Sequence, residues 1–110
     1  MENNSIYLYY KEFKIGKLSF KENKYIYNSL KGEEKAREKY SMIGYNLYNS
    51  NSVKSEYLFD FFELYFIKNI IKKPDLLKII NKTKGDNYFD ILFSFAKIKQ
   101  DDISFYLKDK

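Results

Sequence analysis

The stretch that decides the fold is residues 57–66, which read YLFDFFELYF. Apolar side chains recur in it at helical spacing, so they fall along one stripe of a helix. That stripe consists of Leu58, Phe62, Tyr65 and Phe66, and it is widened by Phe59 and Phe61. The sequence therefore predicts a helix from about Val53 to Ile67 that is buried in the core. Ser52 or Ser55 is expected to cap its first turn.

Three short strands are expected before this helix. Side chains alternate between two faces in residues 5–10, which are rich in the Tyr, Ile and Leu that suit strands. Residues 13–20 and 24–28 have similar composition, and only short connections separate the three segments. Gly16 lies where the alternation changes phase, which predicts a β-bulge or a kink. Strands joined by such short turns form an antiparallel meander.

The segment between the meander and the aromatic helix is of mixed character. Residues 30–40 are highly charged, with opposite charges three and four positions apart, which favours a short exposed helix. Glu33 and Glu34 are expected to be solvated there. Residues 42–48 are more apolar and are expected to form a fourth strand, followed by a loop over residues 49–52.

The C-terminal part predicts two further helices and a strand. Pro74 suits the first turn of a helix, and Gly85 is a good stop signal. Asp86 can cap the next helix, in which apolar residues recur at helical spacing as far as Ala96. Residues 103–107 alternate again and are expected to form a last strand. The order predicts an α+β fold: a small antiparallel sheet, made of the N-terminal meander plus a late strand, packed against three helices.

Length and composition limit what the protein can be. The 110 residues, of which 45% are hydrophobic, fit a single domain spanning residues 1–110. The chain has no Cys and no His, which removes disulfides, thiolate metal ligands and the usual general base. Its Gly residues are isolated, so the sequence contains no glycine loop for phosphates. We therefore expect a protein that is not an enzyme and that needs no cofactor or metal.

Hydropathy and the N-terminal residues bear on location. No run of residues approaches the roughly 18 apolar residues of a membrane span. The N-terminus is polar and lacks the apolar run of a signal peptide. We expect a cytoplasmic protein with no membrane partner.

The net charge of +5 raises the question of a nucleic-acid partner. Arg37 is the only arginine, and base readout depends on the arginine fork, so no direct nucleic-acid contact is expected. A lysine cluster near Asp75 fits a solvated helix face, a contact with an acidic protein, or a phosphate contact. The cluster comprises Lys68, Lys72, Lys73, Lys78, Lys82 and Lys84.

Several short motifs follow one another in an order that resembles a known module. Residues 14–18 resemble a strand of the form hydrophobic-Gly-x-Leu, and residues 24–27 resemble an F-x-Y strand. Residues 58–64 resemble a helix start of the form aliphatic-x-N-F-F-x-x-L, and residues 89–92 resemble an F-D-L-L helix. Over residues 5–108, their order and spacing resemble the N-terminal subdomain of HipA-family kinase toxins, as found alone in HipS-type antitoxins.

The chain also departs from that family pattern. Residues 65–67 replace an L-P-E/D motif, and residues 97–102 replace glycine pairs before the last strand. Residues 46–48 stand where the family has a proline. The ATP-binding and catalytic residues of the kinase body have no counterpart in this sequence.

The resemblance implies an antitoxin that binds and inhibits a separate HipA-type serine/threonine kinase encoded nearby, without catalysis of its own. A helix-turn-helix protein would supply DNA binding in such a system. The docking segment would be residues 46–52, with Tyr48 as the bulky side chain that is inserted. The candidate contact residues are Asn46, Leu47, Tyr48, Asn49, Lys68, Lys72 and Lys73.

Two other functions stay open on sequence grounds. One is a mobile-element inhibitor, such as an anti-defence protein of the anti-CRISPR kind, which would bind a nuclease complex through the lysines of residues 68–84. The other is a nucleic-acid binder, whose affinity would fall steeply with salt concentration.

Overall fold

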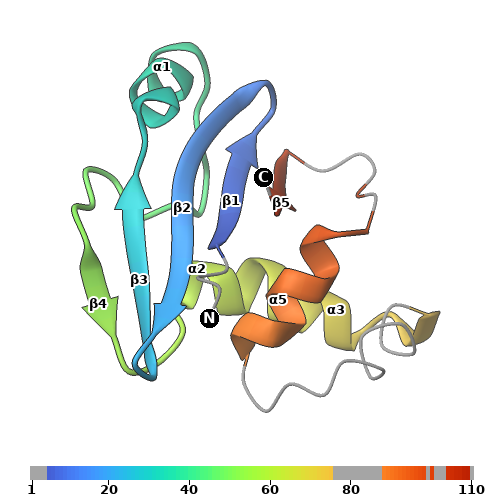
Figure 1. Cartoon of the computed structure of the whole chain (residues 1–110). Coiled ribbons are helices and arrows are strands. Elements are labelled where there is room, and N and C mark those ends of the chain that lie inside the picture. The colour runs from blue at the N-terminus through green and yellow to red at the C-terminus, as the bar shows by residue number, and fades with distance from the viewer. Residues whose placement is uncertain (1–4, 76–87, 99, 101–103, 110) are drawn as a thin grey trace.

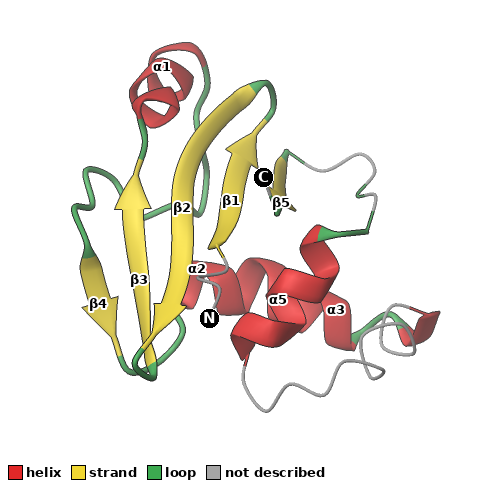
Figure 2. Cartoon of the chain, viewed as in Figure 1, coloured by secondary structure: helices red, strands yellow, loops and turns green. Residues whose placement is uncertain are grey.

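The computed structural model describes residues 5–75, 88–98, 100 and 104–109. An antiparallel five-stranded sheet in the order β4-β3-β2-β1-β5 forms its centre (Figure 1 and Figure 2). The strands are β1 (Ser5–Tyr10), β2 (Phe13–Lys21), β3 (Lys24–Ser29), β4 (Val53–Ser55) and β5 (Phe105–Lys108). The helices are α1 (Lys31–Lys39), α2 (Asp60–Phe62), η1 (Glu63–Ile67), α3 (Lys68–Ile71) and α5 (Tyr88–Ala96). The predicted α+β class, with a meander, a late strand and packed helices, is confirmed.

The three N-terminal strands form the predicted meander. Lys11 and Glu12 connect β1 to β2, while Glu22 and Asn23 connect β2 to β3. Lys11, Glu22 and Asn23 all have positive φ angles, at 53°, 54° and 62°. Tight hairpin turns favour such angles because they match the right-handed twist of the flanking strands.

The phase change at Gly16 is a β-bulge, as predicted. Leu8 pairs with Gly16, but Tyr9 pairs with Lys14, so Ile15 is an extra residue in β2. Ile15 is fully buried. The bulge therefore lets both halves of β2 keep their apolar side chains on the core side.

Gly16 also makes room for a buried tyrosine. Tyr27 lies on β3 and is fully buried. A Cβ atom at Gly16 would lie only 1.8 Å from the Tyr27 hydroxyl oxygen. The tyrosine ring therefore packs directly against a backbone that carries no side chain.

One hydrophobic core lies between the inner face of the sheet and the helices. Ile6 and Leu8 of β1 are buried, whereas the alternating Tyr7 is only partly so and lies on the outer face. Phe62 and Leu92, from two different helices, belong to the same buried cluster as Ile6 and Leu8. The aromatic helix and α5 therefore pack on the inner face.

The aromatic helix begins later than predicted. Residues 53–55 form β4, which pairs with β3, so the predicted helix is wrong over this part. The helix starts at Asp60 after an extended Phe59, and neither Ser52 nor Ser55 caps it. The unpaired edge of β3 offers backbone hydrogen bonds, which outweigh the weak helix preference of this polar segment.

The same helix contains a wide turn. α2, η1 and α3 are continuous, and η1 is a π-helix, in which each hydrogen bond spans five residues. Residues five apart can then share a side. Phe61 and Phe66 are accordingly both buried, and so are Phe62 and Ile67. Of the predicted stripe, Leu58, Phe62 and Phe66 are buried, and Tyr65 is partly buried.

The predicted fourth strand at residues 42–48 is wrong. An irregular segment lies there, and β4 takes the sheet edge instead. Gly44 has a φ of 91°, outside the strand region, and Tyr45 is buried in the core. Residues 49–52 form a loop, as predicted.

The C-terminal part ties a helix to the sheet edge. α5 and β5 confirm the third predicted helix and the last strand within the described residues, and β5 pairs with β1. The Gln100 side chain accepts the Leu107 N–H (2.9 Å) and donates to the carbonyls of Leu107 (3.0 Å) and Phe95 (3.1 Å). Most of the predicted helix from Pro74 to Gly85 lies outside the described residues.

Candidate protein-binding site

The loop that connects α1 to β4, residues 40–52, contains the clearest candidate for a binding surface. Its chain path runs from the end of α1 to the sheet edge (Figure 1). The predicted contact residues Asn46, Leu47, Tyr48 and Asn49 all lie on this 40–52 loop.

A buried carboxylate anchors the 40–52 loop. Glu33 of α1 is only 3% exposed. Its Oε2 accepts hydrogen bonds from the hydroxyls of Ser29 (2.6 Å) and Tyr45. Its Oε1 accepts the backbone N–H of Asn49 at 2.9 Å. The expectation that Glu33 is solvated is therefore wrong, whereas Glu34 is exposed as expected.

The Glu33 carboxylate is linked to a second buried tyrosine. The hydroxyls of Tyr27 and Tyr45 lie 2.8 Å apart. A hydroxyl has only one hydrogen to donate, and that of Tyr45 is directed at Glu33. The Tyr45 oxygen therefore accepts the hydrogen bond that the Tyr27 hydroxyl donates. Burial raises the pKa of both tyrosines, and the neighbouring Glu33 charge adds to the effect. Both hydroxyls are therefore neutral donors in a fixed chain.

Further hydrogen bonds fix the C-terminal part of the loop to β3. The N–H of Ser29 donates to the Ser50 carbonyl, and the N–H of Ser50 donates to the Ser29 hydroxyl, both at 2.9 Å. The Ser50 hydroxyl donates to the Leu47 carbonyl (2.8 Å), and Asn28 accepts the Ser52 N–H (2.7 Å). The loop is thus preorganised by polar contacts although it has no regular secondary structure.

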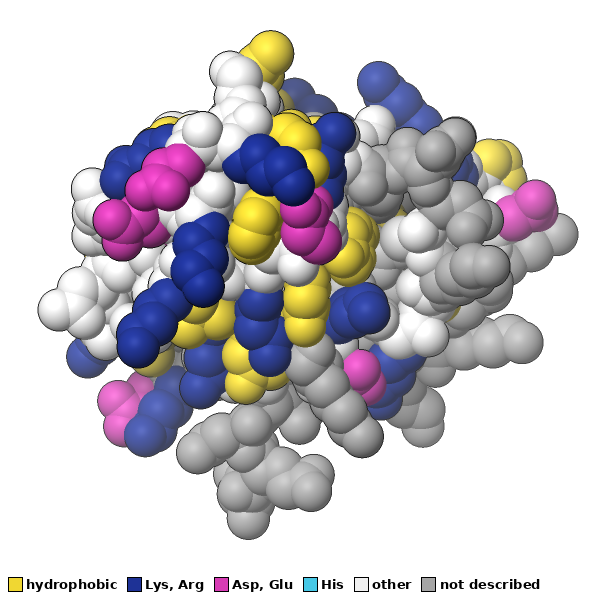
Figure 3. Space-filling model, turned by 90° about the horizontal axis from the view of Figure 1, so that it is seen from above, with side chains coloured by type: hydrophobic (Ala, Val, Ile, Leu, Met, Phe, Trp, Pro, Cys, Tyr) yellow, Lys and Arg dark blue, Asp and Glu magenta, His cyan; other side chains and the backbone are white. Residues whose placement is uncertain are grey.

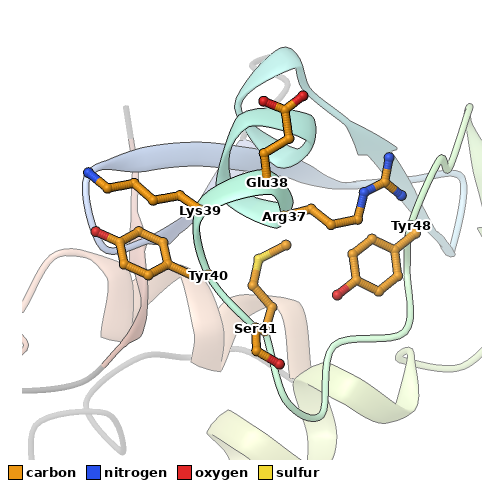
Figure 4. A pocket seen from close by; sticks show the side chains of 7 residues that line it. Arg37, Glu38, Lys39, Tyr40, Ser41 and Tyr48 are labelled. Atoms are coloured by element: carbon orange, nitrogen blue, oxygen red, sulfur yellow. The ribbon is translucent and has the colours of Figure 1, made fainter.

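A polar hollow of about 420 Å³ lies on one side of the loop. It is lined by Arg37, Glu38, Lys39, Tyr40, Ser41, Met42 and Tyr48. Tyr40 and Tyr48 stand on opposite sides of it, beside Lys39 and Arg37 (Figure 4). The Arg37 guanidinium lies 5.4 Å from the centre of the Tyr48 ring, within the range of a cation–π contact.

An ion pair fixes one side of this hollow. Lys39 Nζ lies 3.0 Å from Glu12 Oε2, and the Tyr40 hydroxyl donates to the same carboxylate. The hydrogen bond from Lys39 lowers the pKa of Glu12, and the same contact raises the pKa of Lys39. Both side chains are exposed, so the pair contributes little to stability.

The surface at the end of the molecule that carries α1 is shown in Figure 3. On this surface, Lys and Arg side chains surround small hydrophobic patches.

A smaller apolar hollow of about 190 Å³ lies between the loop and the aromatic helix. It is lined by Gly44, Asn46, Asp60, Phe61, Leu64 and Tyr65. Ile43, the residue before Gly44, is 84% exposed, and Leu64 is 58% exposed. An apolar side chain and an apolar hollow therefore lie next to one another on the surface.

The structure divides the predicted contact residues into two groups. Asn46 lines the apolar hollow and Tyr48 lines the polar one, whereas Leu47 packs against the core. Lys68, Lys72 and Lys73 are exposed at the far end of the aromatic helix and line neither of these hollows. Residues 78, 82 and 84 of the predicted lysine cluster lie outside the described residues.

Sequence reasoning missed Ile43 and Glu33. The sequence did not indicate that Ile43 is exposed, because an apolar residue in a predicted strand is expected to be buried. For Glu33 a signal existed, since Ala36 lies three residues later and shares its helix face. Ala36 is fully buried against the sheet, and Glu33 turns toward the same side.

In comparisons with known proteins, no family model, curated protein sequence or solved structure matches this chain. In the described part of the chain, no group of three or more acidic, His or Cys side chains is placed to hold a metal ion. Within the same residues, no helix combines the length and apolar character that a membrane crossing requires.

Proposed function

We propose that this protein is a non-catalytic, antitoxin-like inhibitor that binds a separate HipA-type serine/threonine kinase. It would act in the cytoplasm, and the 40–52 loop with its apolar hollow would be the docking surface. The observation that carries the proposal is Ile43, an almost fully exposed apolar side chain on a loop that a buried carboxylate holds in place.

Preorganisation is what makes such a loop suitable for binding. A loop that is already ordered avoids most of the entropy cost of being fixed in a complex. The Glu33 contacts to Tyr45 and Asn49 keep the loop in place without a partner. Ile43 can then serve as an apolar anchor beside the apolar hollow, and such anchors supply most of the binding energy of protein interfaces.

The order of elements also supports the proposal. The motif residues 14–18 and 24–27 lie in adjacent strands, and residues 89–92 lie in a helix. The motif at residues 58–64 includes the start of the aromatic helix. The strand β5 lies near the position that the HipA-type subdomain has for its last strand.

The test uses the purified chain and the kinase encoded by the adjacent gene. The wild-type chain should form a complex with that kinase and suppress its autophosphorylation. Ile43→Asp should weaken binding at least tenfold, because it places a charge where an apolar side chain would be buried in the complex. Ile43 is exposed in the free protein, so the variant should keep the wild-type melting temperature.

Ile71→Asp is the matched control. Ile71 is 57% exposed and lies on α3, next to the lysines of the other predicted contact group. This variant should bind and inhibit the kinase like wild type. A kinase whose autophosphorylation is unaffected by the wild-type chain would refute the proposal. Loss of binding in Ile71→Asp but not in Ile43→Asp would move the docking surface to α3.

A further inference from the structure

The outer face of the sheet carries both tyrosine and lysine side chains. It carries the outward-pointing residues of five strands, and it lies opposite the helices. Its aromatic residues are Tyr7 and Tyr9 of β1 and Tyr106 of β5, and none of them belongs to the hydrophobic core. These rings are only partly buried, because no described helix covers them.

Lysines surround the tyrosines on this face. In the strand register, Tyr7 is flanked by Lys17 on one side and by Lys108 on the other, and Tyr9 is paired with Lys14. The lysines at outward positions are Lys14, Lys17, Lys21, Lys24, Lys54 and Lys108. No Asp or Glu occupies an outward position in the described strands.

This charge distribution is unfavourable for the free protein. Lys21 and Lys24 are directly opposite each other in the β2–β3 pair, and like charges in such positions repel. An anion bound to the face would relieve this repulsion. The lysine face is therefore complementary to a polyanion.

Ring faces and ammonium groups alternate across the surface. Lys14 Nζ lies 4.1 Å from the centre of the Tyr7 ring, and Lys108 Nζ lies 5.3 Å from that of Tyr9. The rings of Tyr9 and Tyr106 are stacked, with centres 5.2 Å apart and planes 10° apart. Flat aromatic surfaces and positive charges are therefore direct neighbours on this face.

We propose that the outer face of the sheet binds single-stranded nucleic acid without sequence preference. The lysines would contact phosphates as point charges, and unpaired bases would stack on the tyrosine rings. A binding surface for an acidic protein would need the lysines but not the stacked rings. This inference goes beyond the proposed function and uses a different surface.

The near absence of arginine does not oppose this inference. Base-edge readout depends on the arginine fork, and Arg37 is the only arginine in the chain. Phosphate contacts and base stacking require neither an arginine nor a particular sequence. The scarcity of arginine therefore predicts a lack of sequence preference and says nothing against binding itself.

The test measures binding of the full chain to fluorescein-labelled oligo-dT of 20 nucleotides by fluorescence anisotropy, between 50 and 200 mM salt. The triple variant Lys14→Gln, Lys17→Gln, Lys108→Gln should bind at least tenfold more weakly. Three lost phosphate contacts should also reduce the slope of log K against log salt by about 2. The matched control, Lys68→Gln, Lys72→Gln, Lys73→Gln, has the same net charge and should retain wild-type affinity.

A second variant separates stacking from charge. Tyr9→Leu leaves the net charge unchanged and should weaken oligo-dT binding several-fold. No binding of oligo-dT at 50 mM salt would overturn the inference, as would equal losses in the two lysine triples. Binding of poly-glutamate as tight as that of oligo-dT, with no effect of Tyr9→Leu, would overturn it in favour of an acidic protein partner.

Discussion

The two faces of the sheet use the same residue type, tyrosine, in opposite ways. On the inner face, the buried Tyr27 donates a hydrogen bond to the Tyr45 hydroxyl, which in turn donates one to Glu33. On the outer face, the rings of Tyr7 and Tyr9 are partly exposed and lie beside lysine ammonium groups. Strand alternation places Tyr27 on the inner face and Tyr7 and Tyr9 on the outer face.

The comparison shows how each face accommodates charge. Among the described residues, every buried side-chain nitrogen or oxygen has a hydrogen-bond partner, including the carboxylate of Glu33. The lysines of the outer face have no such requirement, because water solvates them. Substitutions on the inner face should therefore affect stability, and those on the outer face should affect binding.

The largest effect on stability is expected from the apolar part of the inner face. Phe62→Ala should lower the free energy of unfolding by about 3–5 kcal/mol, because it leaves a cavity under the sheet. Leu64→Ala, on the exposed side of the same helix, should change it by no more than about 0.5 kcal/mol. Urea denaturation measures both. Similar midpoints for the two variants would show that the aromatic helix does not form the core.

The polar part of the inner face should come next. Glu33→Gln should cost about 1.5–3 kcal/mol, since hydrogen bonds to a buried charge are replaced by weaker ones. Hydrogen exchange at the Asn49 amide should become faster, because that N–H donates to Glu33. The neighbouring Glu34→Gln should leave both readouts at their wild-type values. A Glu33 variant as stable as the Glu34 variant would contradict the anchoring of the loop.

The buried tyrosines should make the stability of the protein fall at alkaline pH. A tyrosine whose pKa is raised by folding stabilises the protein fully below its unfolded pKa of about 10. Above that pH the unfolded chain ionises first, so stability falls by about 1.4 kcal/mol per pH unit for each such tyrosine. Melting temperatures between pH 9 and 11.5 should therefore fall more steeply for wild type than for Tyr45→Phe. Tyr57→Phe changes an exposed tyrosine and should keep the wild-type dependence of melting temperature on pH. If Tyr45→Phe and Tyr57→Phe show the same dependence, the buried Tyr45 hydroxyl is not the cause of the alkaline loss of stability.

The smallest effect should come from the outer face. Tyr9→Thr removes the stacking on Tyr106 but keeps a residue that suits strands, so it should cost about 0.5–1.5 kcal/mol. Thermal unfolding monitored by circular dichroism is sufficient to measure this. A loss as large as that of Phe62→Ala would mean that the outer face is a second core and not a binding surface.

Local patterns were sufficient to predict the meander. Alternation in residues 5–10 and the phase change at Gly16 are properties of the strands themselves, and both appear in the structure. The helix at residues 88–96 and the strand β5 follow from equally local signals. Elements whose apolar spacing is regular could therefore be predicted without knowledge of their neighbours.

The candidate site could not be predicted as completely, because it depends on contacts distant in sequence. Residues 42–48 have a strand-like composition, but the edge of β3 pairs with residues 53–55 instead. Glu33 is buried only because Tyr45, Ser29 and the Asn49 backbone converge on it. The predicted segment Asn46–Asn49 is part of the 40–52 loop, and Ile43, an exposed apolar residue of the same loop, was missed.

The close approach of Tyr27 to Gly16 ties two positions of the sequence together. A methyl group at residue 16 would overlap the phenol oxygen, and a shorter side chain at residue 27 would leave an empty space and deprive Tyr45 of its donor. Relatives of this chain should therefore exchange the two positions as a pair, with a larger residue at 16 only where residue 27 is small. Such paired replacement would identify descendants of this fold even after their surface residues had diverged.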